Sequence, residues 1–156
     1  MKPGEYLADR TEGITRVEDL PAPLVVQRSR DYRRRLCPRC GRSCFRHGRG
    51  QRTLHDVGCL IHDRPRRLQV VYSQHYCASC DSYFNANMAD LASPGSHYTL
   101  RVIALAVRLV VEDGLPYRLA SWHLWRDHRV FAPFATIQNW TRKRGHPELR
   151  LVRNRK

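Results

Sequence analysis

The sequence predicts an α+β protein in which a small unit bounded by cysteine pairs precedes a group of three helices. Two Cys-x-x-Cys pairs begin and end the segment 37–80. Within it, residues 66–76 alternate in side-chain character, as a half-buried strand does. After a Ser-Pro-Gly-Ser break at 93–96, apolar residues recur with the period of a helix.

The charge of the chain favours a polyanionic partner. The 156 residues carry 28 Lys+Arg against 14 Asp+Glu, a formal net charge of +14. Residues 28–52 hold ten arginines and one acidic residue, Asp31, whereas residues 1–27 are slightly acidic. A solvated charge run is the plain alternative, but the uneven distribution favours a basic arm that contacts phosphate. The preference for arginine over lysine supports nucleic acid as the partner.

Four segments are expected along the chain. Residues 1–35 read as an irregular N-terminal extension with a basic arm, and residues 36–90 as a zinc-ribbon-like finger. Strands are expected at 53–57 and 66–76, with a turn between them around Gly58, Asp63 and Pro65. A three-helix unit follows at 96–145, and a basic tail at 146–156.

The two cysteine pairs are the strongest chemical signal. Each Cys-x-x-Cys can wrap a tight knuckle, so that Cys37, Cys40, Cys77 and Cys80 supply four thiolates to one tetrahedral ion. Gly41 permits the turn that the first knuckle needs, and Asp81 takes that place in the second. We therefore expect structural Zn²⁺, which holds no activated water and supplies much of the folding free energy. A redox dithiol is the rival interpretation, but no βαβ pattern accompanies it.

The remaining cysteines and histidines carry weaker signals. Cys44 and Cys59 suit small buried side chains, although Cys44 is near enough in sequence to compete with Cys40 for the metal. The histidines match no metal-binding spacing and are expected at the surface or near phosphate: His47, His55, His62 and His75.

The helical part predicts a helix-turn-helix arrangement. The apolar pattern places helices near 98–113, 117–127 and 134–144, with Gly114 in the left-handed position that ends the first. Ile137 and Trp140 would point inward, leaving a polar face that can read bases in the major groove. An ordinary three-helix bundle is an equal alternative. With the arginines of the arm and finger, the expected DNA contacts are Arg33, Arg34, Arg35, Arg39, Arg42, Arg46, Arg49, Arg52, Arg66, Arg67, Thr136, Gln138, Asn139, Arg142 and Lys143.

The order of these features resembles the N-terminal DNA-binding region of the ISL-three insertion-sequence transposases. The resemblance rests on CPRCG, the RTLHD strand at 52–56, the strand into Cys77-Ala-Ser-Cys80, and the stretch from Gly114 to Trp140. It implies a zinc finger and helix-turn-helix that bind transposon ends. In that family a separate downstream domain carries catalysis, so the resemblance implies binding without an enzymatic activity.

The expected partner is double-stranded DNA, together with a catalytic transposase subunit or a second copy of the chain. Two alternatives stay open. One is a zinc-stapled protein-interaction adaptor with an aromatic patch formed by Trp122, Trp125 and Phe131, and the other is an RNA-binding protein. Positions 1–20 show no signal-peptide pattern and no apolar segment is long enough to cross a membrane, so we expect a cytoplasmic protein. In that reducing compartment, paired cysteines favour metal ligation over disulfides.

Overall fold

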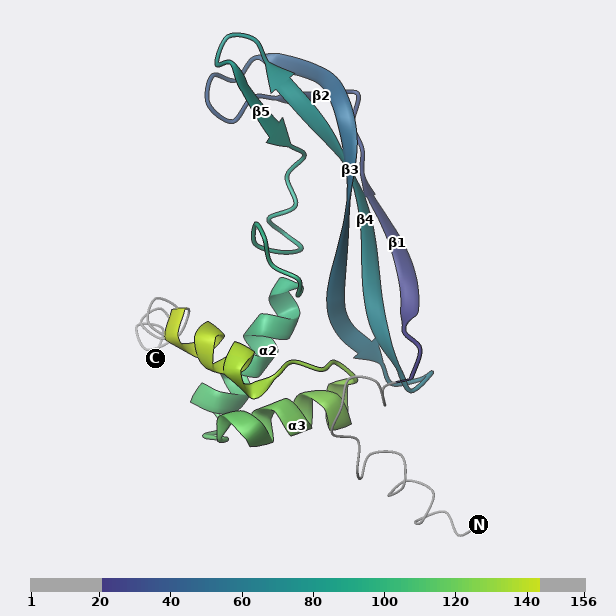
Figure 1. Cartoon of the computed structure of the whole chain (residues 1–156), viewed down its shortest axis with the longest axis vertical. Helices are drawn as coiled ribbons and strands as arrows, with labels where there is room; N and C mark the ends of the chain where they lie inside the picture. The colour runs from purple at the N-terminus through teal and green to yellow at the C-terminus, as the bar shows by residue number, and fades with distance from the viewer. Residues whose placement is uncertain (1–20, 144–156) are drawn as a thin grey trace. The chain divides into compact units, whose positions relative to one another are not determined.

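The computed structural model describes residues 21–143, and the chain there is α+β as the sequence predicts (Figure 1). The predicted tail at 146–156 lies outside these residues. The strands form a five-stranded sheet in which β1, β4, β3 and β2 are neighbours in that order, and β5 pairs with β4. The elements are β1 (Leu24–Arg30), β2 (Arg34–Leu36), β3 (Ser43–Cys59), β4 (Arg64–Cys77), β5 (Ser82–Asn85), α2 (Leu100–Val111) and α3 (Tyr117–His128), followed by a helix over residues 134–143.

Strands β3 and β4 make one long hairpin, visible in Figure 1 as the two longest arrows. Both predicted strands are present, but β3 extends far beyond the predicted 53–57 because the polar and glycine-containing segment 43–52 also pairs in the sheet. The predicted turn is present at residues 60–63 and includes Asp63, but it is shorter than the predicted segment. Gly58 lies in β3 and Pro65 in β4.

The prediction of an irregular extension over residues 1–35 is wrong for the part that the structure describes. Strand β1 and most of β2 lie in this stretch. The arginines of β2 pair antiparallel with β3, with Arg34 opposite Phe45 and Leu36 opposite Ser43. A strand can be this basic because its side chains face solvent while the backbone supplies the pairing.

The described residues divide into two compact units that do not follow the predicted domain limits. Unit 2 comprises 25–56 and 67–100, and the described part of unit 1 comprises 21–24, 57–66 and 101–143. The end of the hairpin therefore belongs with the helices, not with the cysteines.

Unit 2 holds two small buried clusters. One contains Leu54, Leu68, Val70 and Ala92, and the other contains three cysteines with Phe84 packed against them. Strand β4 presents even-numbered residues to the first cluster but odd-numbered residues, from Ser73 onward, to the second. The alternation predicted for 66–76 therefore breaks after Val70.

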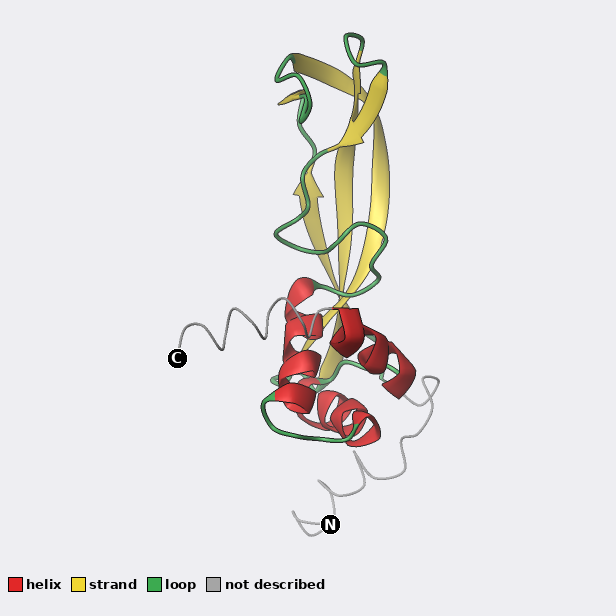
Figure 2. Ribbon diagram, turned by 90° about the vertical axis from the view of Figure 1, so that its left-hand side faces the viewer, coloured by secondary structure: helices red, strands yellow, loops and turns green. Residues whose placement is uncertain are grey.

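Unit 1 contains the three helices of the described chain, shown in red in Figure 2. Their bounds agree closely with the predicted ranges, because the apolar residues recur at helical spacing. Ala120, Leu124 and Ile137 are fully buried, and Gly114 has the left-handed backbone predicted for it, with φ of 69°. These residues form the core of the unit.

Candidate metal centre

The first cysteine pair lies in a tight turn between β2 and β3. Leu36 pairs with Ser43, so residues 37–42 form the turn. The amide of Cys37 donates to the carbonyl of Arg42 at 2.8 Å, and the amide of Gly41 donates to the carbonyl of Cys37 at 2.9 Å. The amide of Arg39 points at the sulfur of Cys37, 3.5 Å away. This knuckle presents backbone N–H groups to a thiolate.

The second pair repeats the arrangement between β4 and β5. Cys77 pairs with Ser82, which places Ala78–Asp81 in the turn. Asp81 has a positive φ of 47°, as Gly41 does at 74° in the first knuckle. Its carboxylate accepts a hydrogen bond from the hydroxyl of Tyr76 at 2.5 Å. Aspartate is among the residues that tolerate the left-handed region, so both knuckles close with the same backbone.

The two knuckles bring four sulfurs to one point. The ligand atoms of Cys37, Cys40, Cys77 and Cys80 all lie within 4.8 Å of one another. The sulfurs of Cys40 and Cys77 are 3.5 Å apart, and those of Cys37 and Cys80 are 4.0 Å apart. Tetrahedral thiolates about 2.3 Å from a zinc ion would be separated by about 3.8 Å. The predicted ligand set is therefore brought together at a spacing that suits a metal ion.

The chemistry of the four thiols also fits a cation. Backbone hydrogen bonding from Cys80 lowers the pKa of Cys77 to about 6. Backbone hydrogen bonds from Cys40 and Arg39 lower the pKa of Cys37. The pKa of Cys80 rises instead to about 12, first because of its hydrogen bond with Cys40. Four adjacent thiols cannot all ionise by themselves, so a tetrathiolate requires a positive ion among them.

Cys44 and Cys59 lie outside this set. Cys44 is 6% exposed and packs against Cys37 and Cys77, and its thiol donates to the carbonyl of Arg42 at 3.4 Å. Burial raises the pKa of the Cys44 thiol. Cys44 therefore supports the centre as a buried neutral side chain, and Cys59 is a half-buried residue at the end of β3, in unit 1.

His75 lies behind the cluster, and the expectation that it is a surface histidine was wrong. It is fully buried and stacks on Phe84, its cross-strand partner, at 5.3 Å between ring centroids. Its Nδ1 is 3.0 Å from the carbonyl of Cys44 and its Nε2 is 2.8 Å from the hydroxyl of Ser73. Because a carbonyl only accepts, Nδ1 carries the proton. His75 thereby ties β3 to β4 next to the cysteines.

The predicted DNA-contacting arginines of unit 2 fall into three groups. The first is exposed around β2 and the first knuckle: Arg33, Arg34, Arg35, Arg39 and Arg42. The second, Arg46 and Arg49, is exposed but pairs with Asp31 at 3.0 Å and 2.8 Å. In the third, Arg52 binds the carbonyls of Ser93 and Ser96, and Arg67 is half-buried.

The sequence analysis did not anticipate the ion pairs of Asp31, because its partners lie fifteen and eighteen residues away.

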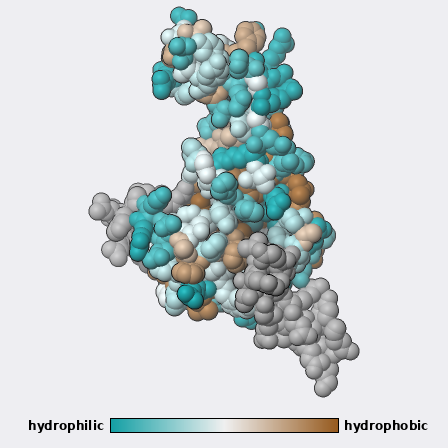
Figure 3. All heavy atoms as spheres, viewed as in Figure 1, coloured by the Kyte–Doolittle hydropathy of each residue, from teal (hydrophilic) through white to brown (hydrophobic). Residues whose placement is uncertain are grey.

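Hydrophilic side chains cover much of the end of unit 2 that carries the knuckles (Figure 3).

In unit 1, the helix over 134–143 keeps the polar face predicted for it. Asn139, Arg142 and Lys143 are exposed, whereas Thr136 and Gln138 are half-buried. Arg66, also in this unit, is half-buried, and its Nε has no hydrogen-bond partner among the described residues.

Of the three aromatic residues that an adaptor could expose, one is packed in the core. Trp125 is 2% exposed, and Trp122 and Phe131 are half-buried.

No protein-family model, no curated protein and no solved structure matches this chain. Within the described residues, none of the helices has the length and apolar character needed to cross a membrane.

Proposed function

We propose that the chain is a DNA-binding protein in which Zn²⁺ staples a basic, strand-rich unit and the last helix of a helix-turn-helix contacts bases. The observation that carries the proposal is the cluster of four cysteine sulfurs within 4.8 Å, made by two knuckles amid exposed arginines. A four-sulfur set suits zinc and leaves no position for a reactive water. The ion would therefore be structural, and we assign the chain no catalytic step.

The charge around the cluster supports phosphate contact. Arg33, Arg39 and Arg42 are exposed near the knuckles, and no described residue pairs with their guanidinium groups. Each arginine that neutralises a phosphate releases a counterion, so affinity falls as salt rises. Arginine forks also match phosphate oxygens in geometry.

The helical unit supports the second half of the proposal. A connection over residues 129–133 joins α3 to the helix over 134–143, and Val130 and Ala132 within it are buried. The hydroxyl of Ser121 donates to the carbonyl of Ala132 at 2.5 Å. The exposed Asn139 and Arg142 can pair with adenine and with guanine or phosphate. The resemblance to ISL-three transposase DNA-binding regions agrees with this assignment, and duplex ends of such elements are the proposed targets.

The test is a duplex-binding titration with the metal-loaded full chain. We expect bound zinc at one equivalent per chain, and binding that weakens about a thousandfold or more between about 50 and about 200 mM salt. Selection of bound duplexes from a random pool would then report any sequence preference. Binding that ignores salt, or a chain that takes up no metal, would contradict the proposal.

A further inference from the structure

A second feature of unit 2 points to unpaired nucleotides. Tyr76 and Tyr83 flank the second knuckle and are directly opposite each other across β4 and β5. Their ring centroids are 4.9 Å apart, and the ring of His47 lies 5.2 Å from that of Tyr83. Three rings from three strands therefore meet at one surface.

This aromatic cluster of His47, Tyr76 and Tyr83 is not part of the protein core. Tyr83 is 66% exposed, and His47 is also exposed. The neighbouring pair, His75 and Phe84, faces the cysteine cluster instead, since successive residues of a strand point to opposite faces. Packing against the cysteine cluster thus explains why positions 75 and 84 carry aromatic rings. It does not explain the exposed ring of Tyr83.

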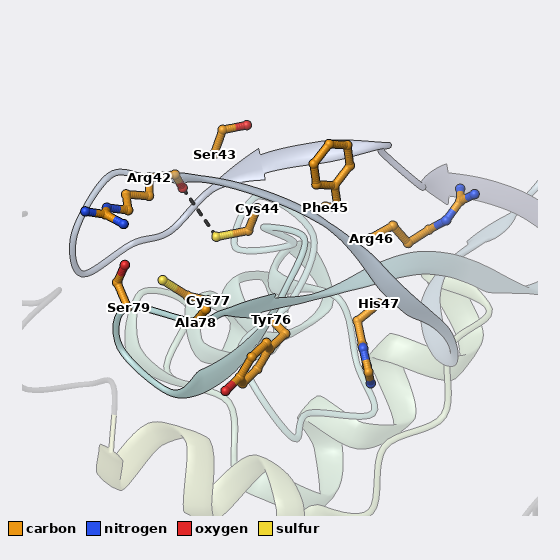
Figure 4. Close-up of a pocket in the computed structure, with 10 residues that line it drawn as sticks. All are labelled: Arg42, Ser43, Cys44, Phe45, Arg46, His47, Tyr76, Cys77, Ala78 and Ser79. Carbon is orange, nitrogen blue, oxygen red and sulfur yellow. Dashed lines mark hydrogen bonds between the residues drawn. The ribbon is translucent and has the colours of Figure 1, made fainter.

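Two members of the cluster, His47 and Tyr76, line a hollow together with Arg42 and Arg46. Its volume is about 310 Å³, and Figure 4 shows Arg42, His47 and Tyr76 among the side chains that line it. In that view His47 and Tyr76 point to the same side of the hairpin. The ring of Tyr76 is held by the hydrogen bond from its hydroxyl to Asp81. The guanidinium of Arg42 has no partner among the described residues.

We propose that the aromatic cluster and Arg42 form a binding site for unpaired nucleotides, with Tyr83 as the ring on which a base stacks. Single-strand sites combine a basic groove for the backbone with aromatic side chains that stack on bases. A paired base is already stacked on its neighbours, so an exposed ring gains most from a base at a strand end or overhang. The site would extend the proposed duplex contact to duplex ends with an overhang, yet it stands on its own residues.

The test measures binding of labelled oligothymidylate, a blunt duplex and the same duplex with a thymidine overhang to the zinc-loaded full chain. Tyr83→Ala should weaken oligothymidylate binding about tenfold while leaving its salt dependence unchanged, because no charge is lost. Tyr83→Phe keeps the ring and should bind as the wild type does. Arg42→Ala should weaken binding and reduce the salt slope by about 0.7, the value for one phosphate on a single strand.

Zinc content and circular dichroism of each variant confirm that the knuckles are intact. Wild-type affinity of Tyr83→Ala for oligothymidylate would overturn the proposal, as would equal losses in the Ala and Phe variants. Blunt-duplex binding is read separately. Its absence in the wild type would contradict the proposed duplex function and leave the single-strand result to be judged alone.

Discussion

Gly41 and Asp81 hold the same position, one residue after each cysteine pair, and both have a left-handed backbone, with φ of 74° and 47°. The two knuckles thus close by the same conformation with different residues. A Cβ added to Gly41 would have no heavy atom within 4 Å, so a substitution there tests the backbone alone.

Gly41→Ala is expected to weaken metal binding and to lower the free energy of unfolding by about 1 kcal/mol, because alanine is disfavoured in the left-handed region. Gly41→Asn should lose less metal affinity and less stability, because asparagine tolerates the left-handed region better than alanine does. Gly95→Ala is a matched control, since Gly95 has φ of 76° and equally open surroundings in unit 2, away from the cysteines. Its metal affinity should equal that of the wild type. Competition with a zinc-chelating dye measures the metal affinity of all three variants.

Replacement of any of the four clustered cysteines by serine should lower zinc stoichiometry or affinity by at least about tenfold. Cys59→Ser should retain the metal, because Cys59 lies outside the cluster. Cys44→Ala should also retain it while lowering stability by about 1 to 2 kcal/mol through lost packing. Cobalt substitution makes this visible as thiolate-to-metal absorption. An unchanged spectrum in Cys77→Ser would refute the assigned ligand set.

Asp31 is expected to restrain nucleic-acid binding, because it neutralises Arg46 and Arg49. Asp31→Asn should raise duplex affinity about two- to tenfold. The slope of log affinity against log salt should steepen by up to the amount that two additional phosphate contacts contribute. Gln51→Asn, an exposed substitution on β3, serves as a neutral control. Unchanged or weaker binding by Asp31→Asn would show that the ion pairs position these arginines instead.

The same carboxylate gives a pH dependence of stability. A hydrogen bond from Arg46, together with the charges of Arg46 and Arg49, holds the pKa of Asp31 below its ordinary value of 3.8. A lowered folded-state pKa gives stability that is present above the unfolded pKa and lost as pH falls through the folded one. Wild type should therefore exceed Asp31→Asn in stability at neutral pH. The difference should begin to shrink as the pH falls to about 3.8 and should vanish only below the lower pKa of the folded state. Urea unfolding at several pH values measures it.

In unit 1, Asp63 and Arg129 form a second informative pair. The Nε of Arg129 donates to Asp63 at 2.6 Å, and the Arg129 side chain is 7% exposed. Asp63→Ala should cost about 3 kcal/mol or more, because it leaves a buried cation without its counter-charge. The double variant Asp63→Ala/Arg129→Met should lose less stability than Asp63→Ala alone. Tryptophan fluorescence reports on this unit, since Trp122, Trp125 and Trp140 all lie in it.

The sequence predicted those features that depend on short spacing. Cys-x-x-Cys pairs specify knuckles over four residues each, and the helices follow from local apolar periodicity, so both were confirmed. Features that depend on distant partners were missed. Nothing near His75 indicates that its ring would meet the Cys44 carbonyl, thirty-one residues away. Strand β2 was missed because its arginines show no apolar alternation, and its pairing is visible only from β3.

The tip of the long hairpin packs with the helices as one compact unit, and this has a practical consequence for dissecting the chain. A Cβ on Gly58 would lie 2.3 Å from the Cβ of Arg129, which shows how closely the two segments approach. A fragment cut out as residues 96–145 would lack Gly58 and Asp63, and one cut as 36–90 would carry them without the helices. Neither unit corresponds to a single uninterrupted stretch of gene. To isolate unit 2, which carries the clustered cysteines, residues 57–66 would have to be replaced by a short reverse turn. That turn would join the shortened strands β3 and β4 directly.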